Sequence, residues 1–279
     1  MFTVVRRQNI LRKSIRRASS SYSKEELTHF GFQTISEVEK KEKVIDVFRS
    51  VSTKYDLMND LMSAGIHRVW KSTFVNNLNP SPEHRILDVA GGTGDIAFRI
   101  LDHLKATNKD SNGGKITVCD INGSMLDVGR SRASAGGYLA PQIEFVEGDA
   151  QALQFPDNSF DAYTIAFGIR NVVRIEEAIS EAYRVLKPGG RFMCLEFAPV
   201  DTPVIGDLYN AYLFNVIPPL GEVVSGDWNS YQYLVESIQN FPPQDDFKQI
   251  IQDAGFRFVT YKNLSLGIVA IHSGFKIPQ

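Results

Sequence analysis

The chain has 279 residues, of which 43% are hydrophobic and 22% are charged. This is the composition of an ordinary soluble protein. No apolar run is long enough to span a bilayer, so we do not expect an integral membrane protein. The length suits one large α/β domain with an insertion, or two small domains that share a cleft, and a single core is the simpler interpretation.

Residues 1–23 differ in composition from the rest of the chain. Apolar and basic positions interleave there, and the stretch closes in Ala18-Ser19-Ser20-Ser21. It has no acidic residue and six basic ones: Arg6, Arg7, Arg12, Lys13, Arg16 and Arg17. This pattern predicts a cleavable transit peptide and a location in the mitochondrial matrix. The alternative is a basic tail that binds nucleic acid or lipid.

The charge of the mature chain follows from that prediction. Removing residues 1–23 takes away six positive charges and no negative ones, which changes the formal net charge from −2 to −8. Phosphate contacts need clustered Lys and Arg, so we expect no nucleic-acid partner. Cys119 and Cys194 lie in apolar runs without CxxC or His-rich surroundings, and we expect small buried side chains there, with neither a disulfide nor a metal site.

After the leader, residues 24–279 are predicted to form one domain that begins with a helical part, 24–80. Helical spacing predicts two helices in this part, one carrying Val44, Val47, Phe48, Val51 and Tyr55 and one from about 67 to 78. From Arg85 onward short apolar runs alternate with helical segments, which is typical of a parallel sheet covered on both faces. The predicted strands are 86–90, 116–119, 143–146, 162–167 and 192–197.

The last third interrupts this alternation. Residues 201–243 are rich in aromatic side chains and are predicted to be an inserted cap over a site. A helix over 245–254 and two strands, 256–261 and 268–272, complete the chain. The pattern predicts a Rossmann-like α/β fold with seven strands, N-terminal helices and a cap.

The strongest local motif is the Gly-rich turn Asp88-Val89-Ala90-Gly91-Gly92-Thr93-Gly94-Asp95, set between a strand and a helix. Such a turn also suits nicotinamide or flavin cofactors, or close packing alone. A dinucleotide site needs G-x-G-x-x-G for its pyrophosphate. This turn reads D-x-A-x-G-x-G and resembles the E/D-x-G-x-G-x-G of class I methyltransferases. The resemblance implies the class I methyltransferase fold, whose seven-stranded, mostly parallel sheet has a terminal antiparallel strand. The predicted cofactor is S-adenosylmethionine, with Gly92 and Thr93 among its contacts.

Two acidic residues follow the next strands. Asp120 ends the second predicted strand and can accept hydrogen bonds from both ribose hydroxyls, each worth about 1.5–3 kcal/mol. Asp149 and Ala150 follow the third strand, where a carboxylate and a small neighbour can receive an adenine ring; the alternative is an ordinary surface turn. The carboxyl ends of parallel strands meet at one sheet edge, so these residues are predicted to converge.

Three further motifs resemble the ubiquinone/menaquinone C-methyltransferases, and the likeness runs from about Lys41 to the C-terminus. They are Tyr55-Asp56-Leu57-Met58-Asn59-Asp60 with Ser63 to Lys71, then Phe167-Gly168-Ile169-Arg170-Asn171-Val172, and finally Ser230 to Ile238 with Phe241-Pro242. The resemblance implies transfer of a methyl group from S-adenosylmethionine to a ring carbon of a polyprenyl benzoquinol. It also implies that Thr93, Asp120, Asp149 and Ala150 bind the cofactor. Ala166 stands where the family often has Ser, which leaves a side-chain hydrogen bond there in doubt.

The mitochondrial leader favours the coenzyme Q branch of that family. This branch implies partner proteins of a coenzyme Q synthesis complex and peripheral association with the matrix side of the inner membrane. Three alternatives remain: a largely structural subunit of such a complex, a small-molecule O-methyltransferase and a nucleic-acid methyltransferase. The last of these carries an Asn/Asp-Pro-Pro-aromatic motif where this chain has Ala166-Phe167-Gly168.

The chemistry needs an ionised quinol, and no metal is required. Arg170 lies just past the fourth strand and is predicted to share one hollow with Thr93, Asp120 and Asp149. It is the candidate catalytic residue, because its permanent charge can stabilise a phenolate; the alternative is a structural ion pair. Asp56, Asn59 and His67 could orient the ring or relay its proton, although helix capping and structural roles are equally open. Tyr55 and the aromatic residues from Tyr209 to Tyr233 are predicted to wall the substrate pocket, or to be core. The segment 208–220 could form the mouth of a channel for the tail or a homodimer surface.

Overall fold

A computed structural model describes residues 26–51, 55–107, 114–138, 140–200 and 202–278. The predicted transit peptide, 1–23, lies outside these residues. The centre of the molecule is a seven-stranded sheet of order β5-β4-β3-β6-β7-β9-β8, in which β9 runs in the direction opposite to the other strands. Its strands are β3 (Arg85–Val89), β4 (Lys115–Asp120), β5 (Ile143–Glu147), β6 (Phe160–Ala166), β7 (Leu186–Phe197), β8 (Arg257–Leu264) and β9 (Val269–Phe275).

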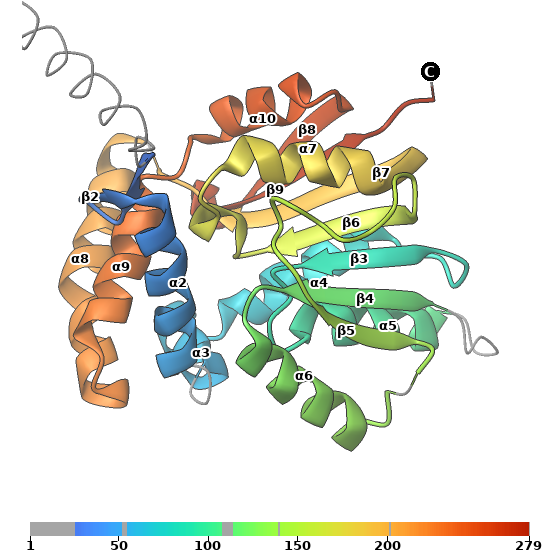
Figure 1. Ribbon diagram of the computed structural model, residues 1–279. Helices are drawn as coiled ribbons and strands as arrows, with labels where there is room; N and C mark the ends of the chain where they lie inside the picture. The colour runs from blue at the N-terminus through green and yellow to red at the C-terminus, as the bar shows by residue number, and fades with distance from the viewer. Residues whose placement is uncertain (1–25, 52–54, 108–113, 139, 201, 279) are drawn as a thin grey trace, which may run out of the picture.

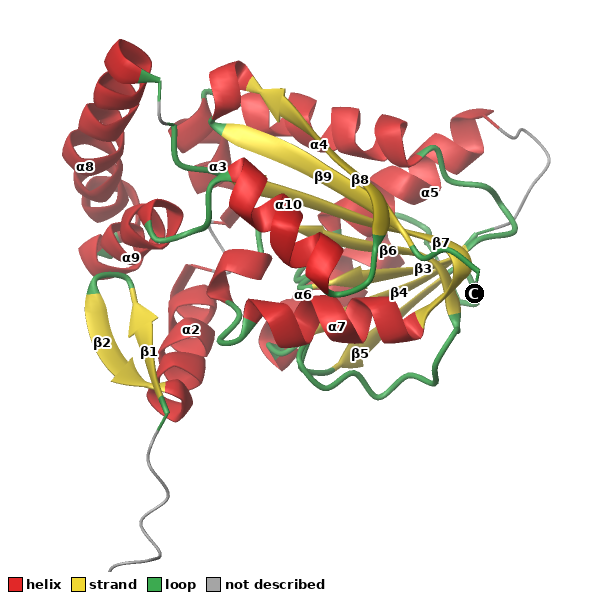
Figure 2. Ribbon diagram, turned by 90° about the horizontal axis from the view of Figure 1, so that it is seen from above, coloured by secondary structure: helices red, strands yellow, loops and turns green. Residues whose placement is uncertain are grey.

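Helices cover both faces of this sheet (Figures 1 and 2). One face carries α4 (Ile66–Leu78), α5 (Asp95–Thr107) and α6 (Gly123–Ala135), and the other carries α7 (Ile175–Val185) and α10 (Gln244–Asp253). Successive residues of a strand point to opposite faces. Ile86 accordingly packs with α4 and α5, whereas Leu87 packs with α7. Burial on both faces explains why the strands read as continuous apolar runs.

The predicted fold is confirmed, but β7 is longer than the strand predicted at 192–197. It already begins at Leu186. The pairing with β6 shifts register between Phe160 and Ala162, where a bulge accommodates the additional residues. Cys119 and Cys194 are both buried as free thiols in inner strands, as predicted.

The N-terminal part is not purely helical. It contains a hairpin, β1 (Leu27–Phe30) and β2 (Gln33–Ser36), before α2 (Glu37–Val51) and α3 (Tyr55–Ser63). Phe30 stacks on Tyr233 with ring centroids 4.0 Å apart, and the Gly31 carbonyl accepts a hydrogen bond from Asn240. The hairpin is therefore held by a segment about 200 residues away, which local sequence patterns do not reveal.

The predicted cap folds as two packed helices, α8 (Pro203–Ser225) and α9 (Trp228–Gln239). They form their own apolar cluster, and Met62 of α3 packs against it. In Figure 1 these helices stand with α2 and α3 on the left, beside the sheet. Pro218 and Pro219 lie inside α8. Among the described helices none combines the length and hydrophobicity needed to cross a membrane.

Candidate active site

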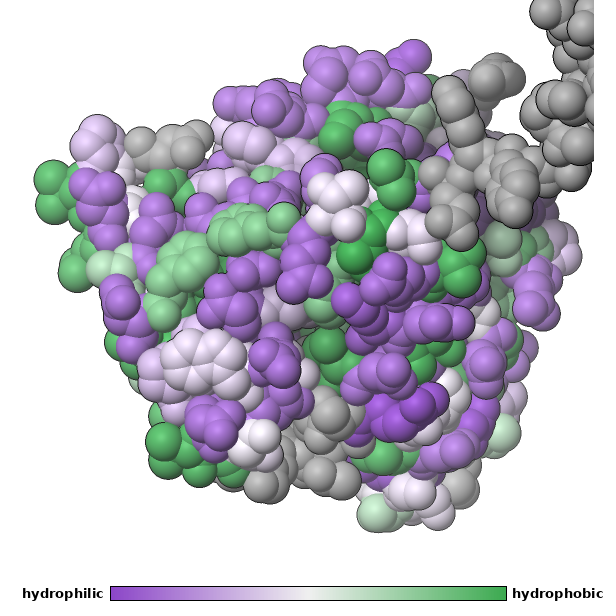
Figure 3. Space-filling model, turned by 60° about the vertical axis from the view of Figure 1, so that its left-hand side comes forward, coloured by the Kyte–Doolittle hydropathy of each residue, from purple (hydrophilic) through white to green (hydrophobic). Residues whose placement is uncertain are grey.

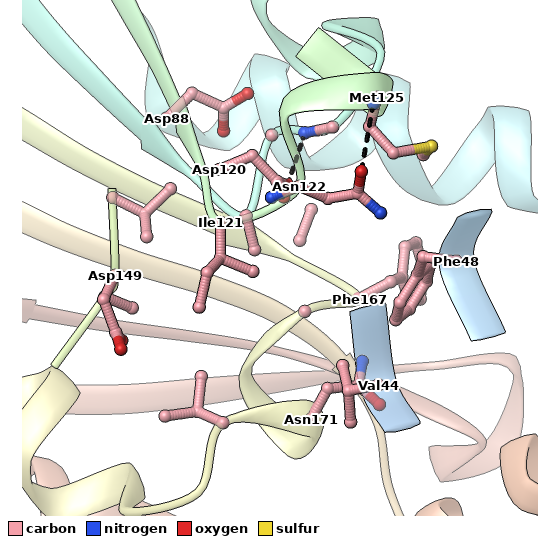
Figure 4. A pocket seen from close by; sticks show the side chains of 18 of the residues that line it. Val44, Phe48, Asp88, Asp120, Ile121, Asn122, Met125, Asp149, Phe167 and Asn171 are labelled. Carbon is pink, nitrogen blue, oxygen red and sulfur yellow. Dashed lines mark hydrogen bonds between the residues drawn. The ribbon is translucent and has the colours of Figure 1, made fainter. Parts of the chain in front are cut away.

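Two cavities adjoin each other between the sheet and the helices that stand beside it. The first, here called the strand-end cavity, has a volume of about 140 Å³ and lies at the loops that follow β3, β4, β5 and β6. Side chains of α2, including Val44 and Phe48, close its open side (Figure 4). The carboxyl ends of the parallel strands thus meet in one hollow, as the sequence predicts.

The glycine-rich turn after β3 forms the floor of the strand-end cavity. Ala90 and Gly92 have φ angles of 50° and 52°, in the left-handed region that only glycine adopts without strain. A Cβ atom on Gly91 would lie 2.7 Å from Val118 Cγ1, so the backbone packs directly on β4. This close approach leaves the turn's backbone facing the cavity.

Asp120 lies at the tip of β4 and is held by the backbone. The Gly92 and Asn122 N–H groups each donate to one of its carboxylate oxygens at 2.8 Å. Burial raises the pKa of Asp120, and the backbone hydrogen bonds oppose that rise. Each carboxylate oxygen keeps a further lone pair, so the side chain can still accept hydrogen bonds from a ligand diol.

Asp149 and Ala150 line the same cavity after β5. The Gln151 N–H donates to Asp149 at 3.0 Å, and Lys41 of α2 forms an ion pair with it at 2.9 Å. Burial alone would raise the pKa of Asp149, but the hydrogen bonds from Gln151 and the ion pair with Lys41 outweigh burial and lower it. The group therefore carries its charge at neutral pH.

Thr93 also lines the strand-end cavity and is buried. Its hydroxyl oxygen accepts a hydrogen bond from Arg132 Nη1 at 2.8 Å. A threonine hydroxyl can accept one bond and donate another, so its proton remains available to a ligand. Ala166 also lines this cavity and has no side-chain group to donate.

The second cavity, here called the helical cavity, has a volume of about 440 Å³ and is predominantly apolar. Residues of α3, α4, α8 and α9 line it, together with η1 (Ile169–Asn171) and the loops beside it. Four side chains line both cavities and mark their junction: Phe48, Lys71, Phe167 and Asn171. Lys71 is buried there and pairs with Asp95 at 2.7 Å, so its positive charge is balanced.

Arg170 lines the helical cavity and not the strand-end cavity. The prediction of one hollow shared by Thr93, Asp120, Asp149 and Arg170 is therefore wrong in that respect. The cause is η1, which turns residues 169–171 away from the tip of β6 toward α9. The guanidinium pairs with Glu196 at 2.9 Å, donates to the Phe167 carbonyl at 2.6 Å and to Ser237 at 3.2 Å.

That pair is almost completely buried, with side-chain exposures of 6% for Arg170 and 1% for Glu196. Burial raises the pKa of Glu196, and the charge of Arg170 opposes that rise. The structural ion pair considered as the alternative for Arg170 is thus present. Nη2 of Arg170 makes no hydrogen bond to any of the described residues, so the ion pair does not use all of its donors.

Comparison with known proteins places the chain in a family. Residues 36–276 match the model of the ubiE/COQ5 methyltransferase family. The chain belongs to this family. It is 54% identical over 277 residues to the mitochondrial 2-methoxy-6-polyprenyl-1,4-benzoquinol methylase of Bos taurus, covering 90% of this chain and 84% of that protein. The Dictyostelium discoideum protein of the same name is 52% identical over 280 residues, with 93% and 89% coverage.

Solved structures show the fold independently. A Thermotoga maritima S-adenosylmethionine-dependent methyltransferase, possibly a histamine N-methyltransferase, superimposes with a TM-score of 0.56 at 20% identity, covering 83% of this chain and 98% of that one. A Haemonchus contortus phosphoethanolamine N-methyltransferase superimposes with a TM-score of 0.55 at 14% identity, covering 75% of this chain and 52% of that one. The chain is therefore an S-adenosylmethionine-dependent methyltransferase with the class I fold.

The strand-end cavity of this family member fits such a cofactor. Asp88 is 1% exposed, and its Oδ1 accepts a hydrogen bond from Thr164 at 2.7 Å. Its Oδ2 lines the turn without a hydrogen-bond partner among the described residues. Burial raises the pKa of Asp88 to about 7. An unpartnered buried carboxylate oxygen suits a ligand that carries positive charge, as the amino and sulfonium groups of S-adenosylmethionine do.

Two further residues, Asn59 and Tyr55, are predicted to contact the substrate. Asn59 lines the helical cavity, whereas the side chain of Tyr55, at the start of α3, lies outside the described part of the structure. Both remain predicted substrate contacts. The cap contributes four tyrosines to the wall: Tyr209, Tyr212, Tyr231 and Tyr233.

Sequence reasoning gave no role to three charged residues of the site. Lys41 and Lys71 are basic residues on amphipathic helices, where a solvent-exposed position is the usual expectation. Glu196 offers a clearer signal, because an acidic residue inside the apolar run Phe192 to Phe197 needs a buried partner. That signal in the sequence is enough to predict a buried basic partner for Glu196, and Arg170 is that partner.

Proposed function

We propose that this methyltransferase transfers a methyl group from S-adenosylmethionine to a ring carbon of a polyprenyl methoxybenzoquinol in ubiquinone biosynthesis. The names of its close relatives support this substrate. The observation that carries the proposal is the helical cavity, which is large and apolar and shares four lining residues with the strand-end cavity: Phe48, Lys71, Phe167 and Asn171. A quinol ring at this junction would meet the cofactor, with its tail among apolar side chains.

The cofactor would lie in the strand-end cavity. Asp120 would accept hydrogen bonds from the ribose hydroxyls, and Asp149 with Ala150 would contact the adenine. Gly92 and Thr93 would contact it through the turn after β3. When bound, S-adenosylmethionine supplies a methyl group on a positively charged sulfur atom.

Carbon methylation needs an electron-rich ring. Ionisation of a quinol hydroxyl pushes electron density onto the neighbouring ring carbon, which then takes the methyl group. The negative phenolate and the positive sulfonium lose their charges together, so a site that excludes water favours the reaction. Alignment of carbon, methyl and sulfur can contribute about 7–11 kcal/mol to lowering the barrier.

Arg170 would stabilise the phenolate. Glu196 and the Phe167 carbonyl hold the guanidinium in place, and the unused Nη2 could donate to the quinol oxygen. Arg170→Lys keeps the charge but loses the planar fork. We expect this variant to lose about 100-fold in kcat, with cofactor affinity unchanged, because Arg170 does not line the strand-end cavity.

The proposed activity is tested with the chain that starts after the leader, labelled S-adenosylmethionine and a short-tailed demethyl quinol. Recovery of label on a ring carbon is the expected result. Label on oxygen would indicate an O-methyltransferase and would overturn the proposal, as would the absence of any labelled product.

We further propose that the enzyme acts in the mitochondrial matrix, peripheral to the inner membrane and beside other proteins of coenzyme Q synthesis. The relatives named above are mitochondrial, which supports the compartment. On the face of the molecule seen in Figure 3, hydrophobic residues are interspersed among hydrophilic ones. Exposed apolar side chains on α8 could contact lipid, a partner protein or a second copy of the chain: Val204, Leu208, Val216 and Val223.

A further inference from the structure

His67 lies at the edge of the junction between the two cavities. It is on α4, its exposure is only 6%, and it lines the helical cavity. Lys71, one helical turn later on the same face, lines both cavities. The imidazole therefore lies close to the place where a quinol ring must meet the methyl donor.

Asp60 fixes the orientation of this imidazole. His67 Nε2 and Asp60 Oδ1 are 2.8 Å apart, and Arg68 donates to the same carboxylate at 2.7 Å. An ionised carboxylate can only accept, so the proton of the neutral imidazole lies on Nε2. Nδ1 is then left with a free lone pair, as in the base of a catalytic triad.

Nδ1 has no hydrogen-bond partner among the described residues and is completely buried. Two other buried polar atoms of the helical cavity are unpartnered in the same sense, Tyr209 Oη and Asn171 Nδ2. Buried polar groups are normally satisfied, so three such atoms around one cavity indicate a ligand that carries hydrogen-bonding groups. A quinol hydroxyl is such a group, and it can donate to Nδ1.

We propose that His67 is the proton acceptor for the quinol hydroxyl and that Asp60 positions it. This inference rests on the proposed function. The O–H bond breaks, an N–H bond forms at Nδ1, and the electron pair stays on oxygen and spreads to the ring carbon. The carbon–methyl bond forms while the methyl–sulfur bond breaks, with its electron pair going to sulfur. The ring carbon then releases its own proton to water, and His67 returns its proton to the oxygen.

The charges around His67 suit a base. Burial lowers its pKa below the ordinary value, the hydrogen bond to Asp60 opposes this, and Lys71 and Asp95 act in opposite directions. Arg170 lines the same cavity, and its charge is paired with that of Glu196. The imidazole is thus neutral at about pH 7.5 and ready to accept a proton.

The first test is His67→Gln, with His103→Gln on α5, away from both cavities, as the matched control. We expect kcat at about pH 7.5 to fall by about 10²–10⁴-fold in His67→Gln only, while cofactor affinity is unchanged. In the wild type, kcat should decrease as pH falls through the pKa of His67. In His67→Gln this acidic limb of the kcat–pH profile should be absent. The kcat of the variant should instead rise with pH as the quinol hydroxyl ionises unaided, near about pH 10.

Asp60→Asn provides a second test that does not need His67 to be replaced. Loss of the carboxylate lowers the pKa of His67 further, because Asp60 raises it. The acidic limb of kcat should therefore move to lower pH, which a purely structural role would not cause. If His67→Gln does not fold, the shift of the acidic limb in Asp60→Asn tests the role of His67 by itself. An unmoved limb in Asp60→Asn, or wild-type kcat in His67→Gln, would overturn the role of His67, whereas C-methylation by the wild type would leave the proposed function standing.

Discussion

Asp120 of the strand-end cavity and the paired residues of the helical cavity are held in different ways. In the strand-end cavity, Asp120 is fixed by the N–H groups of Gly92 and Asn122, both from the strand tips themselves. In the helical cavity, side chains pair with side chains from separate elements, as Arg170 does with Glu196 and His67 with Asp60. The first arrangement comes from the turns of the sheet, whereas the second exists only after helices and sheet have packed.

This difference has consequences for ligand binding. Backbone donors in tight turns are oriented before any ligand arrives, so they hold charge with little reorganisation. Paired side chains in a buried cavity depend on each other, because removing one leaves the other charged and without a partner. We therefore expect substitutions in the helical cavity to reduce stability and those in the strand-end cavity to reduce ligand affinity.

Glu196→Gln should have the largest effect on stability. It leaves the buried guanidinium of Arg170 without its counter-charge, and breaking a buried pair costs about 3–5 kcal/mol of unfolding free energy. Denaturant unfolding measures this change. Asp127→Asn is the control, because its pair with Arg130 is exposed, and it should change stability by less than about 1 kcal/mol. Equal effects in the two variants would show that burial does not make the Arg170–Glu196 pair more important than an exposed pair.

The double variant Arg170→Met with Glu196→Leu sharpens the same test. Apolar side chains of similar size can replace a buried pair without net loss, so most of the stability should return. Methyl transfer should be lost in the double variant, since Arg170 is the proposed phenolate contact. A double variant as unstable as Glu196→Gln would show that the pair contributes more than its mutual charge compensation.

Asp120→Asn should have the largest effect on the cofactor. The variant keeps an oxygen acceptor in the turn but removes the negative charge that strengthens hydrogen bonds from the ribose hydroxyls. We expect S-adenosylmethionine to bind about 10–100-fold more weakly, a loss of about 1.4–2.7 kcal/mol of binding free energy. Calorimetric titration with S-adenosylmethionine measures this, with Asp127→Asn on neighbouring α6 as control. The Asn substitution is preferable to Ala, because Asn keeps an acceptor for one of the Gly92 and Asn122 N–H groups, whereas Ala would leave both unpaired.

Asp88 gives the strand-end cavity a pH dependence. Its pKa is about 7 in the fold against an ordinary 3.8. The folded state therefore binds more protons than the unfolded chain between these values, and stability falls as pH rises. Between about pH 5 and about pH 7.5, ionisation of Asp88 should lower the free energy of unfolding by about 2 kcal/mol. Asp88→Asn, which keeps an acceptor for Thr164, should lack that loss in denaturation measured at both pH values. If Asp88→Asn lost as much stability between the two pH values as the wild type does, Asp88 would be ionised at both of them.

Much of the fold could be predicted because each signal was local. Apolar runs between helical segments located β3 to β7, and the Gly-rich turn, Asp120 and Asp149 all lie at strand tips that a parallel sheet must bring together. The hairpin before α2 was missed, since its four-residue strands depend on contacts with α9. Short strands of mixed polarity carry little pattern of their own.

The helical cavity was less predictable for the same reason. Arg170 was expected at the strand tips, but the 3₁₀ turn at residues 169–171 carries it to Glu196 and Ser237, which are 26 and 67 residues distant in the chain. Family motifs indicated that Asn59 and His67 matter, yet not that they share a wall with the cap tyrosines. Packing between helices fixes that arrangement, and sequence periodicity alone does not specify it.

Lys41→Met tests the smallest expected effect, at the exposed rim of the strand-end cavity. Lys41 is 47% exposed, and its pair with Asp149 should contribute less than about 1 kcal/mol to stability. Asp149 keeps the hydrogen bond from the Gln151 N–H, so it stays in place and cofactor affinity should change by less than about fivefold. Lys43→Met, which breaks a pair with Glu39 on the same helix, is the control. A loss above about tenfold in Lys41→Met alone would mean that this lysine contacts the cofactor directly, and that α2 supplies binding groups as the strand tips do.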